Sequence, residues 1–81
     1  MNLWLLLPID GSGPWTPWYD KCFGLVIRAE TEIQARQIAM ENSGNETDRY
    51  KDVWINSNYS TCQILTADGE PGLIIRDFSA A

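Results

Sequence analysis

The sequence contains no histidine, and it has only six basic residues against eleven acidic ones. Without histidine, the chain lacks the side chain most often used as a general base or as a metal ligand. Its formal net charge of -5 argues against a protein that binds nucleic acid directly, because neutralising phosphates needs a basic face. These two absences disfavour metal-dependent or histidine-based catalysis and direct nucleic-acid binding.

The chain also lacks a hydrophobic run long enough to cross a bilayer. Its first apolar run covers residues 3–7 and ends at Pro8, whereas a spanning helix needs about 20 apolar residues. The run has neither the basic stretch before it nor the small-residue cleavage site after it that a secretory signal requires. We therefore expect a cytoplasmic protein without a membrane partner.

Only two cysteines are present, Cys22 and Cys62, and they form no CxxC pair. Two thiols in a cytoplasmic chain are usually reduced and buried, and we expect this state here. A disulfide would require the fold to bring their Cα atoms within about 7 Å.

The residues that are present support one small folded domain. The chain has 81 residues, of which 44% are hydrophobic, and it includes four tryptophans. This content is enough for a hydrophobic core, whereas a second core would need a longer chain. We expect residues 1–81 to form a single domain, monomeric in solution.

Hydrophobic patterning predicts an α+β fold with one helix on a mostly antiparallel sheet. Thr31 as N-cap, with Gln34 three residues later, predicts a helix from about Glu32 to residue 42 or 43, with Gly44 as its stop. We expect strands over residues 3–7, 23–29, 61–66 and 73–78, with the last two paired as a hairpin. Residues 53–55 fit a brief strand or a core anchor. The predicted order is β-β-α-β-β, with residues 53–55 as an optional short strand before the last two.

The apolar residues of this helix predict which side of it is buried. Ala35, Ile38 and Ala39 fall on one side at helical spacing. Ile33 and Met40 lie off that stripe, which predicts a wide apolar face or a helix covered on two sides.

An aromatic, proline-rich loop occupies residues 9–21. Pro14 and Pro17 stiffen it, and it carries three aromatic residues, Trp15, Trp18 and Tyr19. Such a loop either folds its aromatics over a small core or presents them as anchors for a partner protein. Both interpretations remain open.

Most of the negative charge lies in the second half of the chain. Residues 1–40 hold four acidic and three basic residues, whereas residues 41–81 hold seven acidic and three basic residues. Five of the acids fall in expected loops: Glu46, Asp48, Asp52, Asp68 and Glu70. They provide ordinary solubility, or they gather into one acidic surface that steers the protein toward a basic partner.

No motif predicts catalysis. Gly11-Ser12-Gly13 lacks the lysine of a phosphate-binding loop and precedes a proline, so it is better interpreted as a turn. No histidine is available to activate either cysteine, and no spacing of carboxylates matches a metal site. We expect no enzyme activity, no metal and no cofactor, with chemistry at Cys62 or a carboxylate as the remaining alternative.

Several segments carry a resemblance to known sequences. They resemble short uncharacterised proteins of bacteria and their phages, and they are residues 18–21, 23–29, Glu32 with 35–39, 60–62 and 72–78. In size, acidity and lack of catalytic residues, the chain is also similar to anti-CRISPR proteins. These are phage-encoded single domains, many of which bind a CRISPR effector complex and block its DNA path.

The resemblance implies a non-enzymatic inhibitor that acts in the host cytoplasm. Its partner would be a basic protein surface, in the first instance on a type I CRISPR effector complex, and it would not bind nucleic acid itself. The contact residues would be the three loop aromatics and the five loop acids. The alternative is a bacterial or prophage interaction module with no role in defence.

Overall fold

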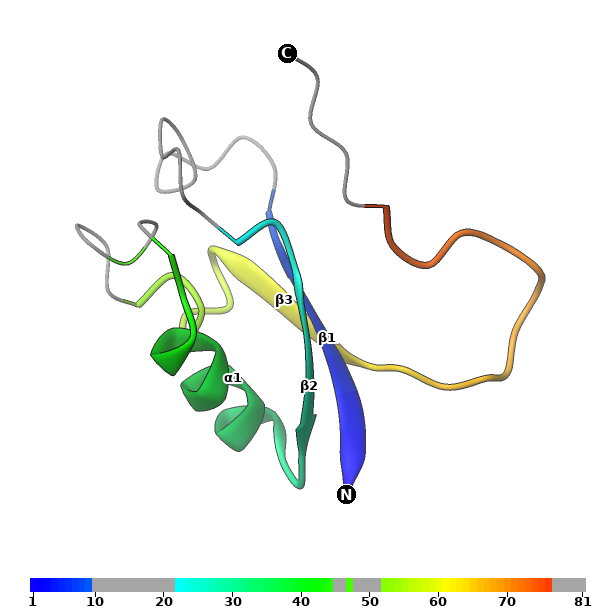
Figure 1. Cartoon of the computed structure of the whole chain (residues 1–81), viewed down its shortest axis with the longest axis horizontal. Helices are drawn as coiled ribbons and strands as arrows, with labels where there is room; N and C mark the ends of the chain where they lie inside the picture. The colour runs from blue at the N-terminus through cyan, green and yellow to red at the C-terminus, as the bar shows by residue number, and fades with distance from the viewer. Residues whose placement is uncertain (10–21, 45–46, 48–51, 77–81) are drawn as a thin grey trace, which may run out of the picture.

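Three antiparallel strands and one helix make up the structure (Figure 1), a computed structural model that describes residues 1–9, 22–44, 47 and 52–76. In chain order they are β1 (Asn2–Pro8), β2 (Leu25–Ala29), α1 (Glu32–Glu41) and β3 (Ser60–Ile64). The strand order in the sheet is β2-β1-β3, so β1 lies at the centre. The α+β class is confirmed, with α1 packed on one face of the sheet.

The central strand β1 is covered on both faces. Trp4, Leu5 and Leu6 are all buried, and because side chains alternate along a strand, consecutive buried residues face opposite sides. Trp4 and Leu6 belong to the core cluster that includes the alanines of α1. Leu5 therefore faces away from the helix.

The pairing register fixes which residues share each face. Trp4 lies opposite Ile27 of β2 and Ile64 of β3, whereas Leu5 lies opposite Val26 and Gln63. The indole N–H of Trp4 donates to the backbone oxygen of Ala29 at 3.0 Å, which satisfies this buried donor.

Helix α1 begins where the sequence predicted. The Thr31 hydroxyl accepts from the Gln34 N–H at 3.1 Å, and the Gln34 side-chain oxygen accepts from the Glu30 N–H at 2.8 Å. Ala35 and Ala39 are fully buried, and their small side chains let the helix approach the sheet closely. The helix ends at Glu41 with Asn42 as its C-cap, so the predicted end at residue 42 or 43 was one or two residues late.

The expectation of a wide apolar helix face, or of a helix covered on two sides, was wrong. Ile33 is 72% exposed and Met40 is 39% exposed. Among the described residues, the buried side chains of α1 are those of Ala35, Arg36 and Ala39, which form a narrow stripe.

Residues 52–55 form a turn that anchors the core. The Ile55 N–H donates to the Asp52 oxygen at 3.0 Å, and the intervening Val53 and Trp54 are fully buried. The core-anchor interpretation of residues 53–55 is therefore confirmed, and a strand is absent there.

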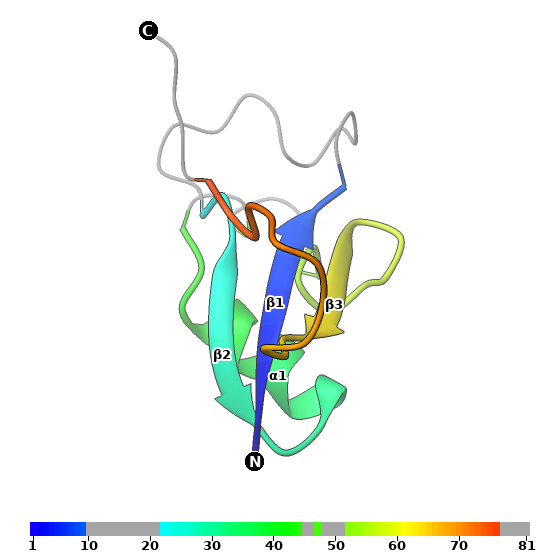
Figure 2. The same ribbon diagram turned by 90° about the vertical axis from the view of Figure 1, so that its right-hand side faces the viewer.

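The predicted final strand was wrong within the part the structure describes. Residues 72–76 have no regular secondary structure, and β3 pairs with β1 rather than with a following hairpin partner. After β3 the chain leaves the sheet edge and crosses the face opposite α1, in front of β1 (Figure 2). Ile75 reaches that face, because a Cβ added to Gly24 would lie 3.2 Å from its Cδ1 atom. The apolar run thus covers a sheet face instead of extending the sheet.

Candidate partner-binding surfaces

The structure describes three of the eight residues predicted to contact a partner. Trp15, Trp18, Tyr19, Glu46 and Asp48 lie outside the described residues. Asp52, Asp68 and Glu70 are described, and all three are exposed.

Asp52 is held by the turn that buries its two following residues. Its backbone oxygen accepts from the Asn56 N–H at 2.7 Å, and its carboxylate accepts from the Asn56 side-chain amide at 3.2 Å. Since Val53 and Trp54 fix the turn in the core, the carboxylate of Asp52 is presented from a rigid base.

Asp68 and Glu70 flank the only described residue with a positive φ, Gly69, at 135°. Nothing lies within 4 Å of the position that a Cβ on Gly69 would take, so this turn stands away from the rest of the chain. The Thr66 hydroxyl donates to the Asp68 backbone oxygen at 3.4 Å. The two carboxylates are therefore presented on an open loop.

The segments that carry these three acids lie on different sides of the sheet. Segment 52–59 lies on the side of α1 and leads into β3, whereas segment 65–76 runs along the opposite side (Figure 1). A partner that touched all three carboxylates would have to reach around the edge of the sheet.

The described acidic and basic residues differ in their exposure to solvent. All six described carboxylate residues are exposed, namely Glu30, Glu32, Glu41, Asp52, Asp68 and Glu70. Of the three described cationic residues, Arg28 and Arg76 are exposed, but Arg36 is buried. The exposed residues of the described part therefore carry a more negative net charge than all of the described residues taken together.

Arg36 is the residue whose role the sequence did not reveal. Its Nε atom donates to Glu32 at 2.9 Å, and its Nη1 atom donates to the Trp54 oxygen at 3.0 Å and to the Ser60 hydroxyl at 2.9 Å. Its Nη2 atom donates to the Ser60 backbone oxygen at 3.2 Å. One guanidinium therefore joins α1, the turn 52–55 and the start of β3. The available signal was its position between Ala35 and Ala39, with Glu32 one turn earlier.

The sheet face opposite α1 forms a second surface, here called the outer face. The strands contribute Leu3, Leu5, Leu7, Val26, Arg28, Thr61 and Gln63 to it, and residues 73–76 cross it. Leu5 is only 7% exposed, but Leu3 and Val26 are 42% and 50% exposed. The crossing segment adds Leu73, Ile74 and Ile75, which are 77%, 62% and 45% exposed.

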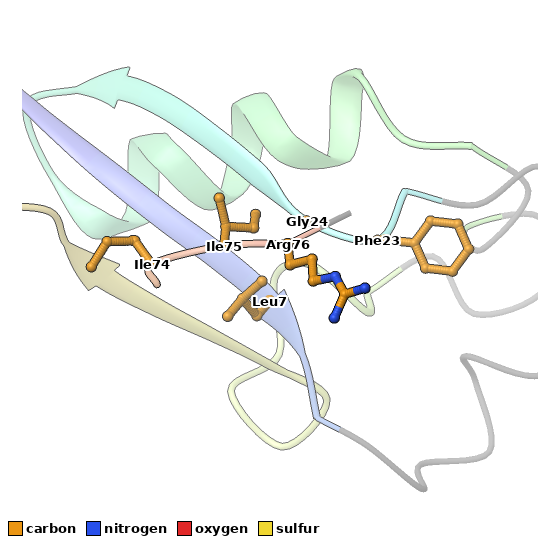
Figure 3. Close-up of a pocket in the computed structure, with 6 residues that line it drawn as sticks. All are labelled: Leu7, Phe23, Gly24, Ile74, Ile75 and Arg76. Carbon is orange, nitrogen blue, oxygen red and sulfur yellow. The ribbon is translucent and has the colours of Figure 1, made fainter. Parts of the chain in front are cut away.

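A pocket of about 270 Å³ opens at one end of the outer face (Figure 3). It is lined by Leu7, Phe23, Gly24, Ile74, Ile75 and Arg76. In this view Arg76 extends between Leu7 and Phe23. A Cβ on Gly24 would lie 3.0 Å from the Leu7 Cδ2 atom and 3.2 Å from the Ile75 Cδ1 atom, so the glycine lets these two side chains pack closely against the strand. The lining is apolar with one cationic group.

Neither cysteine forms a disulfide, and both are half-buried rather than fully buried. The Cys22 thiol donates to the Asn42 oxygen at 3.7 Å. Burial raises the pKa of the Cys62 thiol, and the positive charge of Arg36 partly opposes this rise. A raised pKa reduces the thiolate fraction, so the environment of Cys62 does not activate it as a nucleophile.

Residues 1–9, 22–44, 47 and 52–76 include neither a metal-binding cluster nor a membrane-spanning helix. In these ranges, no three cysteine, aspartate or glutamate side chains come together in a way that could hold a metal ion. The helix described there, α1, has ten residues, and no helix in these ranges is long and apolar enough to span a membrane.

Comparison with known proteins adds no relative to this picture. No protein-family model, no curated protein and no solved structure matches the chain.

Proposed function

We propose that this chain is a non-enzymatic inhibitor that binds a basic surface on a host nucleoprotein, in the first instance a type I CRISPR effector complex. The observation that carries the proposal is the separation of charge by burial. Six described carboxylate residues are exposed, while Arg36 is withdrawn into the core. A surface of this kind complements a groove lined by lysine and arginine.

The mechanism is competition for the cations that normally hold phosphates. Asp68 and Glu70 stand on an open loop, and both are exposed, so a partner can reach them without unfolding any described element. Each carboxylate that pairs with a lysine or arginine of the partner removes one contact from the DNA backbone.

Acids and aromatics contribute differently to the contact. Asp52, with Glu46 and Asp48 outside the described residues, extends the acidic set, and long-range attraction between opposite charges speeds encounter more than it raises affinity. Trp15, Trp18 and Tyr19 supply the apolar anchors that concentrate binding energy at protein interfaces. Since basic residues are interspersed in the chain, the proposed contact is mixed rather than a pure imitation of DNA charge.

A gel-shift titration of purified effector complex with its target DNA tests the proposal. Addition of this protein is expected to reduce DNA binding, and the double variant Asp68→Lys with Glu70→Lys is expected to lose most of that effect. The matched control is Glu30→Lys with Glu41→Lys, which changes the net charge equally at two exposed residues near the ends of α1. The control is expected to keep inhibiting.

Unchanged DNA binding together with unchanged cleavage would refute the inhibitor proposal. Equal loss of inhibition in both double variants would instead refute the assignment of the contact to the loop carboxylates.

A further inference from the structure

Strand β3 lies at one edge of the sheet (Figure 2), and its backbone groups divide between the two sides of the strand by alternation. The Leu3 oxygen accepts from the Leu65 N–H at 2.9 Å, and the Ile9 N–H donates to the Tyr59 oxygen at 3.0 Å. Both pairs continue the register of β1 with β3, so the odd-numbered residues of the two strands bond to each other. The backbone groups of the even-numbered residues of β3 therefore point away from the sheet.

This outer edge of β3 is closed at one end only. The Ser60 N–H donates to the Asn56 oxygen at 3.2 Å, and the Ser60 oxygen accepts from Nη2 of Arg36 at 3.2 Å. Within the part of the chain that the structure describes, the outward backbone groups of Cys62 and Ile64 have no such partner. Each of these two residues presents an N–H donor and a C=O acceptor, roughly 7 Å apart along the strand. Groups of this kind at a sheet edge pair with an added strand.

The flank of α1 beside this edge is apolar and exposed. Arg36 bonds to the Ser60 hydroxyl, so its side of the helix faces β3. Ile33 and Met40 lie three residues before and four residues after Arg36, and residues at this spacing share a helix flank. They are 72% and 39% exposed. The charge of Arg36 is balanced there by Glu32, which pairs with it at 2.9 Å. This flank thus favours apolar rather than charged contacts.

Strand β3 adds apolar side chains on the same side of the sheet. Ile64 lies opposite Trp4, so its side chain is on the side of α1, and it is 50% exposed. Cys62 lies on the same side and is half-buried against the core. Thr61 and Gln63 point to the other side, and both are exposed and polar. An added strand would therefore meet apolar groups on one side and polar groups on the other.

The opposite edge of the sheet is less suited to an added strand. By the same alternation, the outward backbone groups of β2 belong to Val26 and Arg28. Arg28 and the nearby Glu30 are both exposed and charged, and charged residues on an edge strand discourage pairing. The edge of β3 between Cys62 and Ile64 carries no charged side chain.

The position of α1 indicates what kind of strand fits this edge. If two copies of the chain paired through β3, their β1 strands would lie three strand spacings apart, or about 14 Å. Because α1 packs mainly against β2, the two helices would lie further apart than this, whereas packed helices lie about 8–10 Å apart. A second copy would thus leave Ile33 and Met40 uncovered. A separate strand with large apolar side chains would cover them.

We propose that the outer edge of β3 binds an extended segment of a partner protein, which adds to the sheet as an antiparallel fourth strand. Its residues opposite Cys62 and Ile64 are apolar, bond to the backbone of β3 and point toward the flank of α1 that carries Ile33. The residue between them is polar and faces solvent beside Gln63. This contact goes beyond the acidic docking of the proposed function, since it uses other residues and needs no charge on the partner.

The test is hydrogen exchange followed by nuclear magnetic resonance, on the full chain with a synthetic peptide. The probe alternates valine and threonine between terminal lysines and is methylated on the threonine backbone nitrogens, so only the valine N–H groups can bond. The control peptide has the same composition but is methylated on the valine nitrogens. The probe is expected to slow exchange of the Cys62 and Ile64 amides saturably, whereas the control peptide should not. The Val26 and Arg28 amides serve as an internal reference and should not change.

Two variants locate the side-chain contact. Ile33→Ser is expected to weaken probe binding about tenfold, because an apolar contact with the valines is lost. Ile74→Ser is the matched control, since Ile74 is 62% exposed, comparable to the 72% of Ile33, but lies in the segment that crosses the outer face. It should bind the probe as the unmodified chain does. The dispersion of the amide spectrum shows whether each variant keeps its fold.

Several outcomes would overturn the proposal. These are no saturable slowing with the probe, equal affinity for the two peptides, and equal weakening by the two variants. Slowing at Val26 and Arg28 instead would place the added strand on β2. Self-association in sedimentation that the probe reverses would assign the edge to a second copy of the chain. None of these assays contains the effector complex or DNA, so failure here leaves the proposed function standing, and the reverse also holds.

Discussion

At the scale of single residues, Arg36 organises the described structure more than any other charged group. Its guanidinium makes four hydrogen bonds, two of them to backbone oxygens, across three separate segments. The planar guanidinium suits this task because its donors point outward in a fixed fork. Stability therefore depends on one polar side chain as well as on the apolar cluster around Trp54.

Removing the Arg36 side chain should strongly destabilise the fold. Arg36→Ala leaves the Trp54 and Ser60 oxygens without their donor, and each buried acceptor left unsatisfied should cost about 1–3 kcal/mol in the free energy of unfolding. Arg36→Lys should recover only part of this loss, because an ammonium cannot reproduce the fork. Urea unfolding measures the stability of both variants. The control is Arg28→Ala, at an exposed residue, which is expected to change the free energy of unfolding by less than about 0.5 kcal/mol. A similar small change for Arg36→Ala would contradict the assigned role.

The half-buried thiol of Cys62 makes the stability of the protein depend on pH in the alkaline range. Burial raises its pKa in the folded state, so the unfolded chain loses the thiol proton at a lower pH than the folded chain does. Stability from this group is fully present below the ordinary thiol pKa, and it is lost as the pH rises through the folded value. The free energy of unfolding, measured from neutral to alkaline pH, should decline more steeply in the unmodified chain than in Cys62→Ser. Identical slopes would show that Cys62 makes no such contribution.

At the scale of elements, the sequence predicted those parts that local interactions determine. Helix α1 began as predicted because its cap depends on Thr31 and Gln34, which are neighbours in the chain. The first three predicted strands were found because their apolar runs have strand length. The fourth was not, because a run such as Leu73-Ile74-Ile75 is apolar whether it pairs at an edge or covers a face. Only the tertiary arrangement decides between these outcomes.

The helix cap allows a direct test at this scale. Thr31→Ala removes the acceptor of the Gln34 N–H and should cost about 1 kcal/mol of stability. Thr31→Asp keeps an acceptor at the same place and should retain most of the stability that the cap contributes. Thermal unfolding followed by circular dichroism distinguishes the two, and equal melting temperatures for both variants would count against the cap.

At the scale of the whole molecule, the described residues include exposed acidic loops and a largely apolar outer face. The loop acids were predicted to be exposed because turn residues and charge mark solvated segments, and the three that are described are exposed. The outer face could not be predicted, since it depends on residues 73–76 crossing β1 rather than pairing with β3. Burial of Arg36 was missed for the same reason, because its partners Trp54 and Ser60 are distant in sequence.

Association with a basic partner should depend on ionic strength if the acidic loops steer the encounter. The association rate with the effector complex is expected to fall as salt is added, because exposed charges are screened beyond about 8 Å at physiological ionic strength. Asp68→Lys with Glu70→Lys should slow association at low salt and flatten its salt dependence, with little change in melting temperature. Surface plasmon resonance at several salt concentrations measures this. A rate that is insensitive to salt would argue against electrostatic steering.

The central place of β1 also has a consequence for the order in which the protein folds. Trp4 pairs with Ile64, sixty positions along the chain, and Pro8 pairs with Ser60. The loop that these contacts close spans most of the described chain, and such non-local pairing slows folding. During synthesis the apolar strand β1 is therefore paired on one side at most until Ile64 has left the ribosome. Fragments that end before Ser60 should leave one edge of β1 open to other chains and aggregate, which makes premature termination more harmful here than in a sheet whose neighbouring strands follow one another in sequence.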